Sequence, residues 1–171
     1  MKKDVAIIGG LFVVVAALVI FGRGFTSSQF VGISPRPEST KSAAKQKGIT
    51  DITISDLNVS AEVADTVDKR KKGLSDREEL AISSGLLFLF DKSGSYAIWM
   101  KDMRFPIDII WIDESKKIVD IVENAVPQPG KKDEELKRYQ PRSGAKYILE
   151  VNAGLVRLHN IQMGDTVNFE L

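Results

Sequence analysis

Residues Gly85–Asp113, GLLFLFDKSGSYAIWMKDMRFPIDIIWID, decide the fold of this chain. Two apolar runs, Leu86–Phe90 and Ile107–Ile112, frame the stretch, and each is bounded by charge or by turn-forming residues. Runs this short and this rich in Ile, Phe and Trp predict strands rather than helices. The intervening Asp91–Ser95 segment predicts a turn, because Gly94 tolerates positive φ and because Asp and Ser bond nearby backbone.

Further strands are expected on both sides of this stretch. Residues 49–65 alternate between apolar and polar side chains and predict two antiparallel strands with a turn at Ser55-Asp56. Lys116-Lys117 marks a hairpin between Ile107–Ile112 and a strand over Ile118–Val122. Tyr147–Val151 predicts a last strong strand, and Gly164-Asp165 predicts a turn before the end of the chain.

One short helix is expected over Val67–Lys72. Asp65 or Thr66 can cap its first turn, and Gly73 suits the positive φ that often ends a helix. The cations of residues 69–72 would then lie at the helix C-terminus, where the helix dipole favours them. We prefer this interpretation to the alternative of a phosphate site.

No long amphipathic helix follows residue 22, so residues 49–171 predict a mainly β domain with a minor α+β character. We expect a compact β-sheet or small barrel-like domain with one or two short helices. Val126–Lys146 is rich in Pro and charge, and a connection of this length inside a domain is usually functional or mobile.

The N-terminus predicts a single membrane segment. Residues 5–21 carry no charged or polar side chain, which is close to the length needed to span a bilayer. A cleaved signal peptide and an uncleaved signal anchor are the two alternatives, and the length of the run favours an anchor or transmembrane helix over residues 1–22. Lys2 and Lys3 would hold the N-terminus in the cytoplasm, so the folded domain would be extracytoplasmic on a single-pass cell-membrane protein. Residues 23–48 predict a flexible linker.

Composition excludes several classes of protein. Residues 1–48 hold seven Lys and Arg against two Asp and Glu, whereas residues 49–171 hold 17 against 21. An acidic folded part argues against a nucleic-acid partner. The chain has no cysteine, and its single histidine, His159, cannot form a multi-histidine metal site. No metal and no cofactor are therefore predicted.

Several ordered motifs carry a family resemblance. They are Arg70-x-x-Gly73-Leu74, Gly85-Leu86-Leu87-Phe88-x-Phe90, Trp99-Met100-Lys101-Asp102-Met103, Pro106-x-Asp108-Ile109-Ile110, Ile112-Asp113, Tyr147-x-Leu149-Glu150-Val151-x-x-Gly154 and Gly164-Asp165. Together they resemble the DUF192 (UPF0127) family over roughly residues 50–171. The family often has Met where Ser75 stands and Asn-Thr where Asp102-Met103 stands. The resemblance implies a mainly β fold and brings no established reaction.

Two carboxylates fall within expected strands. Asp108 shares a strand face with Ile110, and Glu150 shares one with Ile148. A buried carboxylate is costly unless it is paired, so we expect each to have a cationic partner. The candidate partners are Arg70, Arg77, Lys101 and Arg104. A buried ion pair that fixes packing is the favoured interpretation; a catalytic pair of carboxylates with separated pKa values is the alternative.

The WMKDM segment offers a second candidate surface. If residues 98–105 are extended, Trp99 and Lys101 share one side while Asp102 and Arg104 share the other. Trp99 could stack on a sugar or a cation. The alternative, slightly favoured, is that Trp99 fills the core while Lys101 and Arg104 reach solvent.

Three functions are compatible with these patterns. The first is a membrane-tethered binding or accessory module of the cell envelope, with a small-molecule, glycan or protein ligand. Its candidate ligand-binding residues are Arg70, Arg77, Trp99, Lys101, Asp102, Asp108 and Glu150. The second is an envelope hydrolase that uses Asp108 and Glu150, and the third is a purely structural domain. The absence of a recognisable nucleophile or metal motif favours the first and leaves open whether the protein is an enzyme at all.

Overall fold

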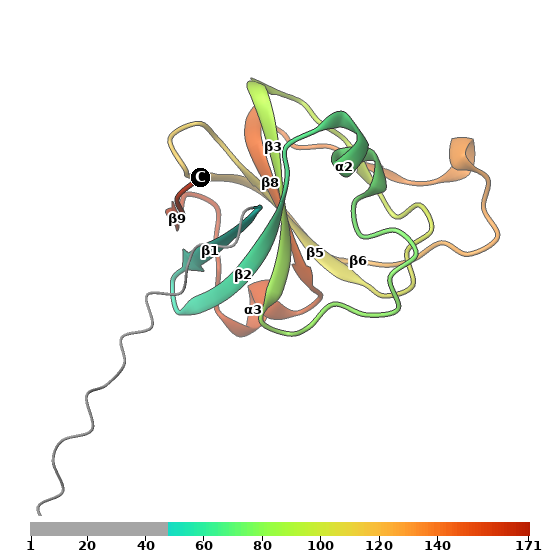
Figure 1. Ribbon diagram of the computed structural model, residues 1–171, viewed down its shortest axis with the longest axis horizontal. Coiled ribbons are helices and arrows are strands. Elements are labelled where there is room, and N and C mark those ends of the chain that lie inside the picture. The colour runs from blue at the N-terminus through green and yellow to red at the C-terminus, as the bar shows by residue number, and fades with distance from the viewer. Residues whose placement is uncertain (1–47) are drawn as a thin grey trace, which may run out of the picture. The chain divides into compact units, whose positions relative to one another are not determined.

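The predicted strands assemble into a curled, half-barrel sheet with two short helices (Figure 1). The computed structural model describes residues 48–171, so the predicted anchor over residues 1–22 and the linker up to residue 47 lie outside the described residues. Within residues 48–171, no helix combines the length and the apolarity needed to cross a membrane. The mainly β prediction for the folded domain is confirmed.

The described elements follow one another along the chain, and the longest connection, residues 73–83, lies between α2 and β3. They are β1 (Ile49–Ile54), β2 (Leu57–Ala64), α2 (Val67–Lys72), β3 (Ser84–Gly94), β4 (Ile98–Trp99), β5 (Ile107–Ile112), β6 (Ile118–Ala125), the 3-10 helix η1 (Asp133–Glu135), β7 (Arg138–Tyr139), β8 (Ala145–Asn152), α3 (Leu155–Leu158) and β9 (Val167–Asn168).

Seven strands form the main sheet in the order β6-β5-β8-β3-β2-β1-β9. Neighbouring strands are antiparallel except β2 and β3, which are parallel and are joined through α2. The two ends of the sheet approach each other where Lys117 bridges Thr166. The backbone N–H of Ile118 also donates to the carbonyl of Asp165 at 3.0 Å. These contacts join the ends of the curled sheet at one point.

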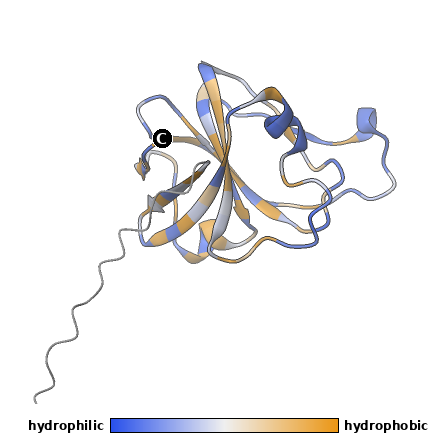
Figure 2. Ribbon diagram, viewed as in Figure 1, coloured by the Kyte–Doolittle hydropathy of each residue, from blue (hydrophilic) through white to orange (hydrophobic). Residues whose placement is uncertain are grey.

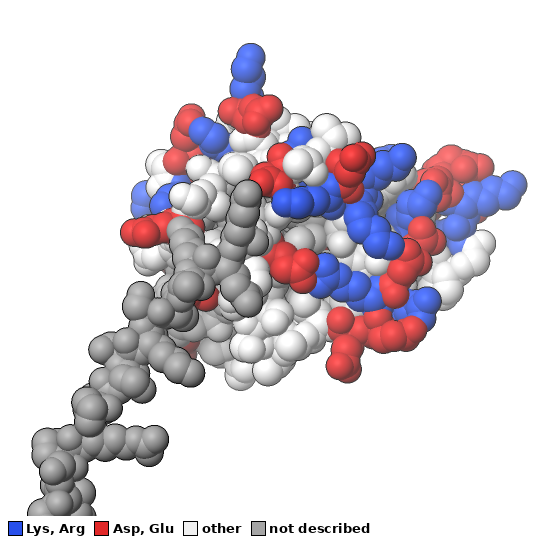
Figure 3. Space-filling model, in the orientation of Figure 1, with Lys and Arg blue, Asp and Glu red and all other residues white. Residues whose placement is uncertain are grey.

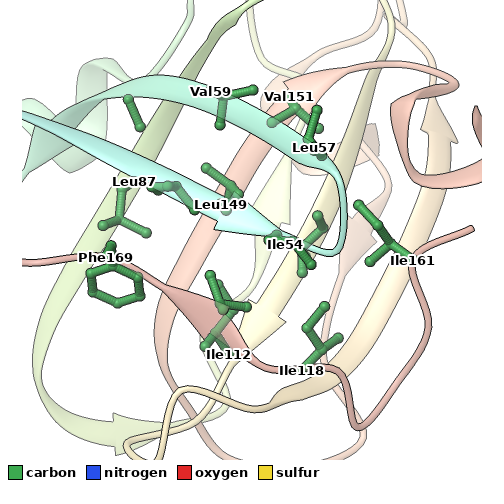
Figure 4. Packing of buried hydrophobic residues seen from close by; sticks show 14 of the residues in the cluster. Ile54, Leu57, Val59, Leu87, Ile112, Ile118, Leu149, Val151, Ile161 and Phe169 are labelled. Carbon is green, nitrogen blue, oxygen red and sulfur yellow. The ribbon is translucent and has the colours of Figure 1, made fainter. Parts of the chain in front are cut away.

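The two faces of the sheet bury separate hydrophobic clusters. The first core fills the inside of the curl and includes Ile54, Val59, Leu149 and Phe169 (Figure 4). The second core lies on the opposite face, under α2 and the β4–β7 pair. Successive residues of a strand point to opposite faces of the sheet. The central strands carry apolar residues in succession, so both of their faces are apolar, and hydrophobic colour runs along them in Figure 2. The second core is formed by Ala64, Leu74, Leu80, Leu86, Phe88, Ile98, Met100, Ile107, Ile109, Trp111, Ala125, Tyr139, Ala145 and Ile148.

Local turn chemistry explains the elements that were predicted correctly. The β1–β2 turn has Ser55 at φ 53°, and Lys116 at φ 62° lies in the β5–β6 turn. Helix α2 has the predicted bounds, with the Thr66 hydroxyl accepting from the backbone N–H of Lys69 at 3.2 Å and Gly73 ending it at φ 52°. The four cations of residues 69–72 lie in its last turn, as expected.

Two predictions for the central stretch are wrong. The strand after Gly85 continues to Gly94, because Gly94 pairs with Ala145 of β8 after a register shift, so the turn expected at Asp91–Ser95 is strand for most of its length. Residues 98–105 are not extended throughout. The chain turns after Trp99, Met100 is buried, and Asp102 has a left-handed φ of 53°.

Candidate functional site

Asp108 is fully buried in β5, and its carboxylate is satisfied by backbone alone. Its Oδ1 accepts from the N–H of Asn124 at 2.8 Å, and its Oδ2 accepts from the N–H groups of Gly154 and Val156, both at 2.9 Å. The last two belong to the N-terminus of α3, where backbone donors are free and the helix dipole favours an anion. The prediction of a cationic partner for Asp108 is therefore wrong, because three backbone N–H groups donate to its carboxylate.

A bulge in β6 prepares this arrangement. Ile107 pairs with Ala125 and Ile109 pairs with Val122, so two residues of β6 oppose Asp108 alone. The second of them, Asn124, has φ 52°. Such a bulge re-aims backbone groups, and here the N–H of Asn124 is turned onto the carboxylate. Asp108 thus joins β5, β6 and α3 and has a structural role.

Glu150 lies in β8 with 4% of its surface exposed, and its carboxyl makes no hydrogen bond within residues 48–171. Its register partners are Leu86 on β3 and Ile109 on β5, both in the second core. Burial among these side chains raises the pKa of Glu150 from 4.5 to about 8, against the opposing charge of Arg77. The carboxyl is therefore mainly protonated at neutral pH.

Arg77 was an expected partner, and it is engaged elsewhere. Its guanidinium donates to both carboxylate oxygens of Glu62, at 2.6 and 2.8 Å. This pair lowers the pKa of Glu62 and raises that of Arg77. Glu62 pairs in register with Leu86, which in turn pairs with Glu150, so the Arg77–Glu62 pair lies two strands from Glu150 on the same face. Arg77 acts on Glu150 through charge alone.

The register excludes a catalytic pair of Asp108 and Glu150. Asp108 pairs with Val151, whose side chain lies in the first core, whereas Ile109 pairs with Glu150 and lies in the second core. Residues opposite each other on neighbouring strands share a face, so the two carboxylates lie on opposite faces of the sheet. A single substrate cannot reach both of them, and the hydrolase hypothesis built on this pair is wrong.

Glu150 lines a small cavity of about 80 Å³, which we call the Glu150 pocket. The pocket is formed between the end of α2, the β4 region and the second face of the sheet. Its lining residues are Arg70, Lys71, Lys72, Gly73, Leu74, Ser75, Phe88, Ala97, Ile98, Trp99, Met103, Ile107 and Glu150. Glu150 is the only acidic residue among them. The cavity therefore combines an apolar wall, a cationic border and one uncharged carboxyl.

Arg70 anchors α2 over this cavity. Its Nη1 donates to the carbonyl oxygens of Asp65 at 2.9 Å and Leu89 at 2.8 Å, and its guanidinium lies 5.1 Å from the centre of the Phe90 ring. These bonds attach the helix to β3. Figure 3 shows Lys and Arg side chains interleaved with Asp and Glu on the side of the domain that carries α2. Arg70 thus lines the pocket, but its Nη1 donates to backbone carbonyls that hold α2 in place.

Trp99 lies at the border of the pocket with a cation on its ring. It pairs with Arg138 between β4 and β7, and the Arg138 guanidinium carbon lies 4.2 Å from the centre of the ring. The Lys101 ammonium lies 5.8 Å from the same centre. The favoured expectation that Trp99 fills the core is wrong, since it is half-buried and belongs to neither core. Trp99 does stack on a cation, and this cation comes from the chain itself.

Lys101 and Asp102 line a neighbouring cavity of about 90 Å³ rather than the Glu150 pocket. Lys101 forms an ion pair with Asp133 of η1, which raises the pKa of Lys101. Arg104, the fourth expected partner, pairs with Glu78. The sequence candidates therefore separate in space: Arg70, Trp99 and Glu150 share one pocket, Lys101 and Asp102 share another, and Asp108 lies on the other face of the sheet.

Two features escaped the sequence analysis. Asp120 in β6 is buried and accepts from the backbone N–H and the guanidinium of Arg142, which lowers the pKa of Asp120. Arg138 covers Trp99 although the two are 39 positions apart. A two-residue strand within a polar connection carries little periodic signal, so β7 and its contact with β4 could not be read from the sequence. His159 is bonded through Nδ1 to Asp56 at 2.8 Å, away from the pocket lining.

Comparisons with a family model and with curated proteins indicate the same family. A family model for DUF192, described as "Uncharacterized ACR", matches residues 50–169. UPF0127 proteins of Thermococcus sibiricus and Thermococcus kodakarensis are 28% and 29% identical over 109 residues, or 64% and 63% of this chain. The chain spans 65% and 62% of the lengths of these two relatives.

Two solved structures are similar to the described domain. One, from Sinorhizobium meliloti 1021, is described as a candidate transcription regulator; it has a TM-score of 0.62 and 27% identity, with 71% of this chain and 92% of that chain covered. The other, from Novosphingobium aromaticivorans, is described as a protein of unknown function; its TM-score is 0.61 and its identity 27%, with 70% and 83% covered.

Proposed function

This chain belongs to the DUF192 family, and from that premise we propose that it is a ligand-binding module whose site is the Glu150 pocket. One observation carries the proposal: a buried carboxyl lines a cavity and lacks any hydrogen-bond partner in the described part of the chain. Among residues 48–171 no fully buried side-chain oxygen lacks a hydrogen-bond partner, so the Glu150 carboxyl oxygens keep some exposure at the cavity. A ligand in the cavity would supply the hydrogen bonds that the protein itself does not make.

A binding role fits the pocket better than a catalytic one. Acid–base chemistry on a bound substrate usually needs a second polar group with a different pKa at the same centre. The pocket holds one acid, and its cationic border residues include Arg70, whose donors are bonded to backbone carbonyls. Within residues 48–171, no three His, Asp or Glu side chains converge as metal ligands would.

A fragment screen with a blocked pocket tests this function. Ala97 is exposed and lines the pocket, so Ala97→Trp should cover its entrance with little effect on the core. Ala81→Trp is the matched control, since Ala81 is exposed and lies outside the pocket lining. We expect fragments that bind the full-length protein and Ala81→Trp, as detected by ligand NMR, and that lose binding to Ala97→Trp. Fragments that bind all three proteins equally, or none at all, would contradict the proposal.

The tether is a second part of the proposed function. Residues 5–21 would hold the module on the membrane with the folded domain on the extracytoplasmic side, since the apolar run follows Lys2 and Lys3. Fractionation of cells that produce the full chain should place it with the membranes, with its N-terminus intact. Recovery of a soluble form that begins after residue 22 would show cleavage and would overturn the anchor.

A further inference from the structure

We propose that the Glu150 pocket recognises an uncharged amide head, a primary carboxamide or a lactam, through two parallel hydrogen bonds to the Glu150 carboxyl. This inference rests on the proposed binding function and names its ligand class. Its basis is geometric: a carboxyl with 4% of the residue exposed lines a small cavity that has an apolar wall and a cationic border, and no donor or acceptor of residues 48–171 is bonded to it.

The walls of the cavity disfavour a charged ligand head. Leu74, Phe88, Ile98, Met103 and Ile107 supply no group that could solvate an ion. Their burial effect keeps the Glu150 carboxyl protonated at neutral pH, and the same effect would act on a ligand carboxylate. An ammonium group would also lie beside Arg70, Lys71 and Lys72, which line the same pocket, and would require Glu150 to lose its proton.

The protonated carboxyl defines which uncharged groups fit. Its O–H donates and its C=O accepts, and both lie on one edge of the group. A primary carboxamide and a lactam place an N–H and a C=O on one edge in the same way, so each satisfies both carboxyl atoms at once. A secondary amide in the usual trans form points its N–H and C=O in opposite directions and can make only one of the two bonds.

The size of the cavity sets the rest of the ligand head. About 80 Å³ is several times the volume that a single water needs, so a few non-hydrogen atoms fit. A short branched aliphatic stem behind the amide would contact Phe88 and Met103. Isobutyramide has this form, and isobutylammonium and isobutyrate are charged probes of nearly the same shape.

The test measures the affinity of the three probes for the full-length protein in detergent micelles by ligand NMR. We expect isobutyramide to bind at pH 7 and the two charged probes to bind at least tenfold more weakly. Raising the pH from 7 to 9 should weaken isobutyramide binding about tenfold, because only the protonated carboxyl is competent. Tighter binding of either charged probe would overturn the amide assignment.

Two substitutions of Glu150 distinguish the contribution of the carboxyl to binding from the contribution of the cavity shape. Glu150→Gln keeps a donor and an acceptor on one edge, so it should keep isobutyramide binding and remove its pH dependence. Glu150→Met has a similar volume and no such pair, so it should lose binding at least tenfold. Equal binding by Glu150→Met and the unchanged protein would overturn the inference.

The blocked variant separates failure of this inference from failure of the proposed function. If a charged probe binds best and Ala97→Trp abolishes that binding, the pocket is a ligand site and the amide class is wrong. If no probe binds in a way that Ala97→Trp abolishes while Ala81→Trp preserves it, the amide inference fails. The proposed function is then decided by the wider fragment screen with the same two variants.

Discussion

Asp108 and Glu150 are buried carboxylates on adjacent strands of one sheet, and the protein treats them in opposite ways. Asp108 faces the first core and accepts three backbone N–H groups at 2.8 to 2.9 Å. Glu150 lies on the face of the sheet that carries the second core and accepts no backbone N–H group, and its pKa is raised to about 8. Burial alone therefore does not distinguish a structural carboxyl from a candidate binding group, whereas its hydrogen bonds do.

The difference follows from what each face places beside the carboxyl. The first face brings a bulge and the start of α3 to Asp108, and both supply unpaired backbone donors. The second face brings side chains of regular strands to Glu150, whose own backbone donors are used in the sheet. A strand environment offers a side chain few free backbone groups, so the Glu150 carboxyl makes no hydrogen bond within residues 48–171 and keeps some exposure at the pocket.

The largest expected effect is on the Asp108 side of the comparison. Asp108→Asn should reduce the free energy of unfolding by about 3 to 5 kcal/mol, because an amide group cannot accept all three N–H groups, so one donor is orphaned and the other two lose a charged acceptor. Denaturant unfolding of the full-length protein measures this loss. No cation pairs with Asp108, so removal of a neighbouring cation should not restore stability.

Asp102→Asn is the matched control for Asp108→Asn. Asp102 is exposed, and its left-handed φ of 53° is one that Asn adopts readily. Its stability should change by less than about 0.5 kcal/mol. A loss below about 1 kcal/mol for Asp108→Asn would show that the three amides do not hold the carboxylate as described.

The next effect concerns Glu150 and depends on pH. The folded-state pKa of about 8 lies above the ordinary 4.5, so unfolding releases a proton between these values. Stability is unaffected below about pH 4.5 and falls by about 1.4 kcal/mol per pH unit up to the folded-state pKa. Glu150→Gln lacks this loss. Its stability relative to the unchanged protein should therefore rise with pH, to about 3 kcal/mol at pH 7.

Unfolding curves at pH 4.5, 6, 7 and 8.5 measure this difference. The comparison between variant and unchanged protein cancels the other titrating groups. A difference that stays constant across the series would show that Glu150 ionises at its ordinary pKa, and the contrast between the two carboxylates would then disappear.

The sequence carried enough information for the framework of the fold. Alternation of apolar residues placed β1 and β2, and short apolar runs placed β5 and the core of β8, because half-buried strands show the first pattern and fully buried strands the second. The cap and the glycine placed α2 correctly, since both act within a few residues. Short-range chemistry is visible in a sequence, and these elements depend on it.

The site was only partly predictable for a physical reason. Alternation assigned Asp108 to the face of Ile110 and Glu150 to the face of Ile148, and both assignments are correct. Whether these two faces are the same depends on strand register, which links residues far apart in sequence. The donors that bind Asp108 are backbone N–H groups, which every residue except proline carries, so the amino-acid sequence does not indicate them. The sequence analysis therefore expected cations where amides stand.

A third buried carboxylate offers an intermediate case. Asp120 accepts from backbone N–H groups of Ile121 and Arg142 and also from the guanidinium of Arg142. Asp120→Asn should cost about 1 to 2 kcal/mol at pH 7, less than Asp108→Asn, because Asn keeps one acceptor and the Arg142 side chain can return to solvent. The lowered pKa of Asp120 gives stability that is present at neutral pH and lost as the pH falls through the acidic range.

Asp120→Asn should accordingly lose its effect in acid. Thermal unfolding at pH 7 and pH 3 compares the two conditions. An equal cost at both pH values would show that the Asp120 carboxylate does not gain from its partners, and the ranking of the three carboxylates would fail.

The smallest expected effect tests whether the border of the pocket influences Glu150. Arg138 covers the Trp99 ring at 4.2 Å and lies on β7 outside the pocket lining. Arg138→Ala should cost about 0.5 to 1 kcal/mol, the value of an exposed cation–π contact. It should also make the fluorescence of Trp99 easier to quench with acrylamide, while fully buried Trp111 stays protected. Because desolvation by the second core and not Arg138 raises the pKa of Glu150, the pH at which Glu150→Gln gains stability should not move. A shift of that pH in an Arg138→Ala background would mean that the border sets the ionisation of Glu150, and the explanation from the face of the sheet alone would be insufficient.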